Sequence, residues 1–364
     1  MKNLTNLVAA AVALTIVSAC GGGGSSSAPV ASSPSPAAAP SPSPAPTATT
    51  PDLVLSVAAS TYPPASVEKG AWDLLMSQRS ACGFGLLQQD TRLDAASASH
   101  SHYLVQNSLD KLLTVIGHGE DSTWANFTGG NPFDRVAHAG YPTFSPSLGV
   151  TEILTNFFSF VPQGQAAPLV LSEATGAAQM RGLLETVYHL AGAMNAGRAG
   201  GVGMSNGTGP SNSGAYFQQQ FRLVADFAVA SDNLQRLGSS TVATWPCAGL
   251  SGVAGAFKPT TESPNPFPDV TDSAVTYGTP IYFKADAGSK LVVSAATVTK
   301  VSDSSVLALR QLTSATDAAG EIGANEVFLV STTALAAGSS YSVSASGTLN
   351  GAAFTKAFMF STAP

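Results

Sequence analysis

The sequence predicts two folded domains, a layered α/β domain followed by an all-β sandwich. Helical and strand patterns mix over residues 63–247, which is typical of helices packed on a sheet. Residues 248–364 alternate short apolar segments with turns, which is typical of a β-sandwich. Residues 21–51 are almost entirely Gly, Ser, Pro, Ala and Thr and offer almost nothing to bury, so they predict an unfolded segment before both domains.

The first 19 residues predict a signal peptide. Lys2 supplies a positive charge, residues 7–17 form an apolar run too short for a comfortable membrane span, and small residues precede Cys20. This pattern resembles the bacterial lipobox, in which the cysteine is lipidated and anchors the protein to a membrane. The alternative is an ordinary signal peptide. By resemblance to enterobacterial sorting rules, Gly21 in place of Asp implies the outer membrane, so we expect an extracytoplasmic, lipid-anchored protein.

Residues 20–62 are expected to be the lipidated cysteine followed by a Pro-stiffened tether. No other stretch is apolar enough to span a bilayer. The net charge is −6 and only 10% of residues are charged, which argues against a nucleic-acid partner because such proteins need a basic surface.

The cysteine count agrees with export. With Cys20 assigned to the anchor, Cys82 and Cys247 remain as one pair in an oxidising compartment. We therefore predict a Cys82–Cys247 disulfide; the alternative is two buried free thiols.

The α/β domain is predicted from periodicity. Apolar residues recur at helical spacing in 65–79, 90–107, 134–139 and 176–193. Strands are predicted at 201–204 and 216–229 from β-branched and aromatic residues. Scattered glycines at 197–203 follow a helix and enter a strand, which is the reverse of the order in a phosphate-binding loop.

The all-β domain is predicted from its turns. Asn350-Gly351 is a strong hairpin signal between two alternating segments. The expected strands are 280–283, 290–296, 306–312, 326–330, 341–348 and 353–360.

Several short motifs in the first domain resemble one family in their order and spacing. They are Cys82-Gly83 with 90–96, His118-Gly119-Glu120 with 133–136, Thr151-Glu152-Ile153, and Val187-Tyr188-His189 with Gly201-Val202-Gly203. Together they are similar to bacterial CAP domains (SCP/TAPS; cysteine-rich secretory proteins, antigen 5 and pathogenesis-related 1 proteins). The resemblance implies an α-β-α sandwich over 63–247, and residues 248–364 resemble an immunoglobulin-like β-sandwich.

The resemblance also implies a cleft lined by two histidines and two acidic residues. His118, Glu152 and His189 match three of these positions, although Glu152 lacks the family's Gly and Asn neighbours. Glu185 is a candidate for the second acid because it precedes His189 by four residues on one predicted helix. Glu120, two residues after His118, is another candidate.

These side chains allow two kinds of chemistry. His118, Glu152 and His189 could hold a divalent metal such as zinc. Without metal, a His–Glu pair could act as a general base, but no supported nucleophile accompanies it. By contrast, His100 is expected to be a hydrogen-bonded core histidine, and Arg135 is expected to pair with Asp94 or Asp134.

The first-ranked function is a binding module for a hydrophobic ligand, a peptide or a protein partner. A structural or adhesive surface protein with a vestigial cleft is second. A metal-dependent or His–Glu hydrolase is third.

Overall fold

The computed structural model describes residues 50–112, 114–145, 147–162, 169–211 and 214–364. The chain divides into two compact units, Met1–Ala45 and Pro46–Pro364, and every described residue belongs to the second. The predicted signal peptide, the predicted lipidation site Cys20 and most of the predicted tether lie outside the described residues. No helix in the described ranges has the length and apolar character to cross a bilayer.

The helices begin at side chains that accept hydrogen bonds from their first turn. Ser66, Asp90, Asn131 and Ser172 act as such N-caps, which satisfy backbone N–H groups that the helix itself cannot. The helices are α1 (Val67–Cys82), α2 (Thr91–Asp110), α3 (Pro132–His138), α4 (Glu173–Leu184) and α5 (Val187–Ala193), with a 3₁₀ turn at Pro259–Thr261.

The first sheet has the strand order β1-β4-β5-β2 within the described residues. Strand β3 also pairs with β5, along residues 216–221, whereas β2 pairs with residues 224–230 of the same strand. Its pairs are antiparallel except β1 with β4. The strands are β1 (Gln88–Gln89), β2 (Leu148–Leu154), β3 (Phe157–Pro162), β4 (Ala199–Pro210) and β5 (Tyr216–Ala230).

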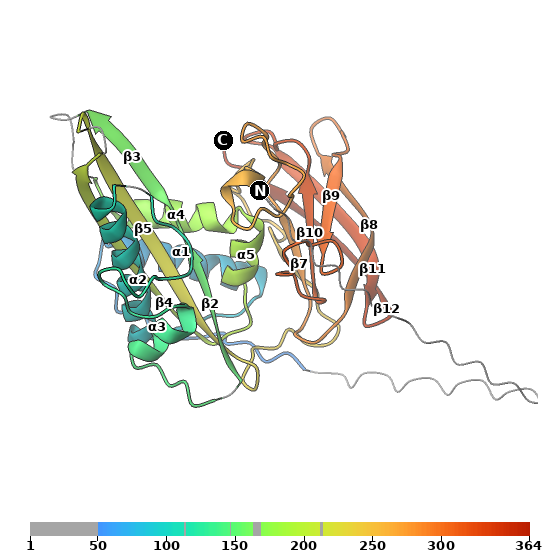
Figure 1. Ribbon diagram of the computed structural model, residues 1–364. Helices are drawn as coiled ribbons and strands as arrows, with labels where there is room; N and C mark the ends of the chain where they lie inside the picture. Colours follow the sequence, from blue (N-terminus) through green and yellow to red (C-terminus); the bar gives the residue numbers. More distant parts are fainter. Residues whose placement is uncertain (1–49, 113, 146, 163–168, 212–213) are drawn as a thin grey trace, which may run out of the picture. The chain divides into compact units, whose positions relative to one another are not determined.

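Helices cover both faces of this sheet (Figure 1). On one face, Leu93 of α2 packs with Ala228 of β5. On the other face, helices α1, α4 and α5 share a core with Val202 and Leu223. Alternate residues of a strand point to opposite faces, so each strand contributes side chains to the helix layers on both faces of the sheet. A mixed α/β architecture is therefore confirmed.

The second part of the chain is built from antiparallel strands in two further sheets, with orders β6-β7-β10-β9 and β12-β11-β8 among the described residues. Phe283 and Phe358, one from each sheet, pack with ring centroids 6.3 Å apart. The predicted Asn350-Gly351 turn joins β11 to β12 with positive φ at both residues. The strands are β6 (Ala243–Trp245), β7 (Ile281–Lys284), β8 (Leu291–Lys300), β9 (Leu309–Thr313), β10 (Glu326–Ser331), β11 (Ser340–Leu349) and β12 (Ala352–Ser361).

Three features differ from expectation. The single helix predicted over 176–193 is two helices, because the chain breaks between Leu184 and Val187. Strands β1, β2 and β3 had not been predicted. Strand β6 lies before residue 248, where we expected the second domain to begin, and pairs with β7 of the second part.

The two parts share one hydrophobic core and one covalent link. Leu75 of α1 and Phe283 of β7 belong to the same buried cluster. The predicted disulfide is confirmed: Cys82, at the end of α1, is bonded to Cys247, just after β6. Disulfides are typical of oxidising compartments.

The disulfide gives a first testable prediction. It closes a loop with a sequence separation of 165 residues, so removing it should enlarge the unfolded ensemble. We expect the double variant Cys82→Ser, Cys247→Ser to lose about 2–4 kcal/mol of unfolding free energy in urea titrations. Reductant should weaken the wild type and leave the variant unchanged; equal wild-type stability with and without reductant would contradict the prediction.

Candidate functional site

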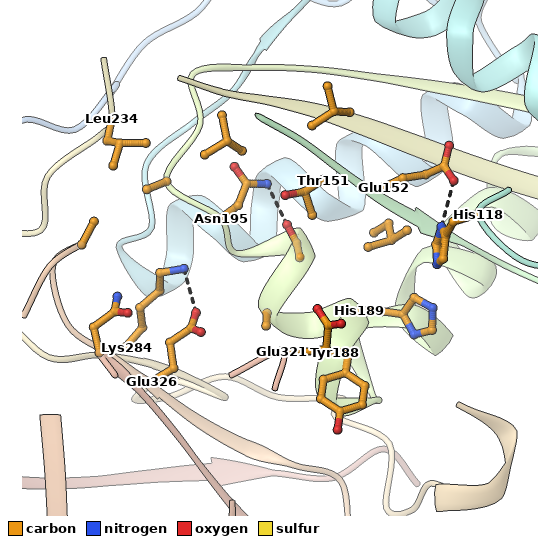
Figure 2. Close-up of a pocket in the computed structure, with 18 of the residues that line it drawn as sticks. His118, Thr151, Glu152, Tyr188, His189, Asn195, Leu234, Lys284, Glu321 and Glu326 are labelled. Atoms are coloured by element: carbon orange, nitrogen blue, oxygen red, sulfur yellow. Dashed lines mark hydrogen bonds and ion pairs between the residues drawn. The ribbon is translucent and has the colours of Figure 1, made fainter. Parts of the chain in front are cut away.

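A pocket of about 520 Å³ lies where β2 and α5 face the second part of the chain. We call it the histidine pocket because His118 and His189 line it (Figure 2). Its walls carry both polar and apolar side chains from the two parts. Besides the histidines they are Val150, Thr151, Glu152, Ile153, Tyr188, Ala191, Gly192, Asn195, Ala196, Val229, Leu234, Ser263, Pro264, Lys284, Ala287, Glu321, Asn325 and Glu326.

His118 is held by a buried carboxylate. Its Nδ1 lies 2.8 Å from Oε1 of Glu152; the histidine side chain is 42% exposed and that of Glu152 only 1%. The other oxygen of Glu152 accepts a bond of 2.6 Å from Nη2 of Arg135, and Nη1 of Arg135 donates to the His118 carbonyl at 3.0 Å. The expected pairing of Arg135 with Asp94 or Asp134 is therefore wrong. Arg135 instead ties α3 to β2 and to the histidine segment.

A second carboxyl group stands beside Glu152. Asp226 is its cross-strand neighbour on β5 and is fully buried. Burial raises the pKa of Asp226 well above its ordinary value, and the charge of Glu152 raises it further. Burial also opposes ionisation of Glu152, but the bond to His118 and the charge of Arg135 hold its pKa below the ordinary value. Of the two carboxyl groups, Asp226 therefore holds a proton more readily, and Glu152 more readily carries the negative charge behind His118.

His189 is held in a similar way by a residue far along the chain. Its Nδ1 forms a hydrogen bond of 2.9 Å with the Thr186 hydroxyl and lies 3.0 Å from Oε1 of Glu262, in the segment that links the two parts. The Glu262 carboxylate also accepts bonds from the backbone N–H groups of Val187, Tyr188 and His189, at 2.8, 2.7 and 3.1 Å. Glu262 therefore starts α5 as well as orienting the imidazole, which explains why the helix predicted over 176–193 is broken.

Nδ1 of His118 thus binds a carboxylate, and Nδ1 of His189 binds the Thr186 hydroxyl beside a carboxylate, so that Nε2 is the ring nitrogen left for a ligand in both. The Glu152 carboxylate is not free for a ligand, because its two oxygens are engaged by His118 and Arg135. Among the described residues, no group of three or more His, Cys, Asp or Glu side chains is placed to hold a metal ion. A catalytic zinc ion usually has three protein ligands. The expected set of His118, Glu152 and His189 therefore does not fit zinc.

Glu120 does not line the histidine pocket. Its buried carboxylate binds Nδ1 of His100 at 2.9 Å and accepts a bond from the backbone N–H of Thr128 at 2.6 Å. The other ring nitrogen of His100 lies 3.0 Å from the Gly117 carbonyl. The prediction of a hydrogen-bonded core histidine is confirmed, and Glu120 is its partner.

Glu185 also lies elsewhere. It follows the end of α4 rather than sharing a helix with His189, so the expected spacing argument does not apply. It lines a smaller pocket with Trp245 and Val253, and its Oε1 has no hydrogen-bond partner among the described residues. Burial raises the pKa of Glu185 to about 7.

The second part of the chain contributes a charge pair to the histidine pocket. Nζ of Lys284 lies 3.2 Å from Oε1 of Glu326, and Figure 2 shows this pair away from the two imidazoles. The Tyr282 hydroxyl and the Gly323 N–H also donate to Glu326. The pair is internally compensated, so it adds polarity to the pocket without a net charge.

No protein-family model matches the chain, and no curated protein matches it. Three residues behind the histidines were missed in the sequence: Arg135 in this role, Asp226 and Glu262. Glu262 stands in a proline-rich linker 73 residues after His189, so no local spacing connects the two. A charged residue within the apolar second half of β5, between Ala225 and Phe227, was the available signal for Asp226.

The Glu262 contacts give a second prediction. Replacing Glu262 with Ala leaves three backbone N–H groups without their acceptor, so we expect a loss of about 2–4 kcal/mol of unfolding free energy in urea. Glu262→Gln keeps one acceptor oxygen and should lose less. Glu321→Ala is the control, since this exposed acid lines the same pocket and should change stability by less than about 0.5 kcal/mol. Equal stability of Glu262→Ala and Glu321→Ala would rule out the capping role.

Glu185 gives a third prediction. Its pKa rises from 4.5 to about 7 on folding, so the folded protein binds a proton that the unfolded chain releases. The wild type should therefore lose stability relative to Glu185→Gln as pH rises from about 4.5 to about 7, and the difference should level off above that. Urea titrations of both proteins at pH 5 and pH 8 measure this difference in unfolding free energy. A difference that is the same at both pH values would show that Glu185 titrates normally.

Proposed function

We propose that this protein is an exported binding module that holds its ligand in the histidine pocket. The arrangement that carries the proposal is a pair of imidazoles on the wall of one 520 Å³ cavity, each with its Nδ1 engaged: His118 by Glu152, and His189 by the Thr186 hydroxyl beside Glu262. Ligand pockets place oriented polar groups among apolar side chains, and the lining of the histidine pocket contains both kinds. The ligand classes that suit it are an amphipathic lipid and a peptide.

The proposal includes how the module is displayed. Residues 1–19 act as a signal peptide and lipid on Cys20 anchors the protein to a membrane, with the outer membrane favoured. The sequence motifs around His118, Glu152 and His189 support a CAP domain for the first part, and the two antiparallel sheets support an immunoglobulin-like sandwich for the second. The disulfide agrees with an extracytoplasmic location.

One observation favours a second function, hydrolysis assisted by His118. An imidazole backed by a carboxylate can take a proton from water. Binding is preferred because oriented imidazoles serve recognition without a nucleophile. The hydrolase hypothesis requires that the wild type hydrolyse a substrate and that His118→Ala lose this activity.

The test of the binding function uses residues 46–364, the compact unit, and two probes. Palmitate represents lipids, and a phage library of random heptapeptides represents peptides. We expect at least one probe class to bind.

The variant Ala196→Trp, which fills the pocket, should weaken that binding by about tenfold or more, measured by calorimetry. Ala353→Trp, at an exposed position of β12, is the matched control and should bind like the wild type. Binding of neither probe would favour a structural or adhesive protein, and binding that survives Ala196→Trp would place the site elsewhere.

A further inference from the structure

The edge of β2 forms part of the pocket wall. Four consecutive residues of this strand, 150–153, line the cavity. A strand that presented one face would contribute alternate residues, because neighbouring side chains point to opposite faces. Consecutive residues indicate that the pocket meets the strand from the side, where its backbone groups project. Strand β2 is also the last strand in its sheet's order.

The hydrogen-bond pattern shows which backbone groups project into that edge. Ser231 N–H donates to the Ser147 carbonyl and Thr155 N–H donates to the Leu223 carbonyl, both at 2.9 Å, at the two ends of the β2–β5 ladder. Bonded residues alternate along an antiparallel strand, so the odd-numbered residues of β2 bind β5. The N–H and C=O groups of Val150 and Glu152 therefore point away from the sheet.

These outward groups have no partner within the described ranges of the chain. The neighbouring outward N–H, that of Leu148, donates to the Ser145 carbonyl at 3.1 Å, but no such bond is formed by the backbone of Val150 or Glu152. Half-buried backbone groups that lack a protein partner need water or a ligand. An open strand edge is a template for pairing with another extended chain.

The two imidazoles flank this edge from opposite faces of the sheet. His118 binds the Glu152 side chain, which lies on the α2 and α3 face. His189 belongs to α5, on the other face, where Gly192 closely approaches the side chains of Thr151 and Ile153. A chain lying along β2 would run between them.

We propose that the ligand is an extended peptide segment that pairs with β2 as an added strand, with its backbone bonded to Val150 and Glu152 and its side chains beside His118 and His189. This inference rests on the proposed binding function and specifies its ligand class. Residues 150–153 span about 10 Å, enough for three or four peptide residues. The chain's own segment 21–51 is a poor occupant because its many prolines lack the N–H that the pairing requires.

The experiment scans the backbone of the ligand. The tightest heptapeptide selected on the wild type and lost on Ala196→Trp is resynthesised with one amide N-methylated at a time, and each dissociation constant is measured by calorimetry. Strand pairing predicts losses of about tenfold at alternate residues and little effect at the residues between them, because only every second N–H faces β2. The unaffected positions are the matched controls.

A protein variant provides a second measurement. Val150→Pro removes an outward N–H and no bond of the β2–β5 ladder, so the protein should keep its fold while binding the peptide about tenfold more weakly. If this variant unfolds, the N-methyl scan still tests the strand-pairing inference, because it uses the wild-type protein. Peptides that bind in the pocket without a period-two pattern overturn the strand-pairing inference, as does binding of palmitate alone, and both outcomes leave the proposed binding function standing. Binding of neither probe overturns both proposals.

Discussion

The ion pair between Arg135 and Glu152 is the interaction on which the geometry of the candidate site depends. Both side chains are buried, and Arg135 also holds the backbone of His118. One guanidinium therefore joins helix α3, strand β2 and the histidine segment. A buried charge without its partner is strongly unfavourable, so the pair leaves each of these elements little freedom to shift. Burial and the charge of Glu152 raise the pKa of the neighbouring Asp226, so Glu152 is the carboxyl group of the two that more readily carries the charge.

The second part of the chain contributes residues to the histidine pocket as well as to the shared hydrophobic core. Glu262 reaches back to start α5 and to orient His189, and Lys284 and Glu326 form a wall of the histidine pocket. The disulfide and the shared hydrophobic core hold the two parts against each other. A ligand in this pocket would contact both parts, so binding and the stability of their junction should be coupled.

Local patterns predicted the elements that depend on local physics. Helices α1, α2 and α3 begin at capping side chains and have apolar residues at helical spacing, and the strands of the second part have alternating patterns bounded by turns. Strand β2 was missed because the buried charged Glu152 interrupts its apolar residues, and that charge is tolerated only because Arg135 and His118 meet it. The break between α4 and α5 was missed for a similar reason, since the carboxylate that begins α5 comes from a distant segment.

The sequence by itself determined the mixed α/β character, most helices and strands, the Cys82–Cys247 disulfide and the grouping of His118, Glu152 and His189, which line one pocket. These follow from residue spacing, cysteine count and short motifs. Only the tertiary structure decided which carboxylate meets which imidazole, placed Glu120 and Glu185 outside the pocket, and opened the edge of β2 to it. His118 and Glu152 are 34 residues apart and His189 and Glu262 are 73 apart, and contacts over such separations are set by how whole elements pack.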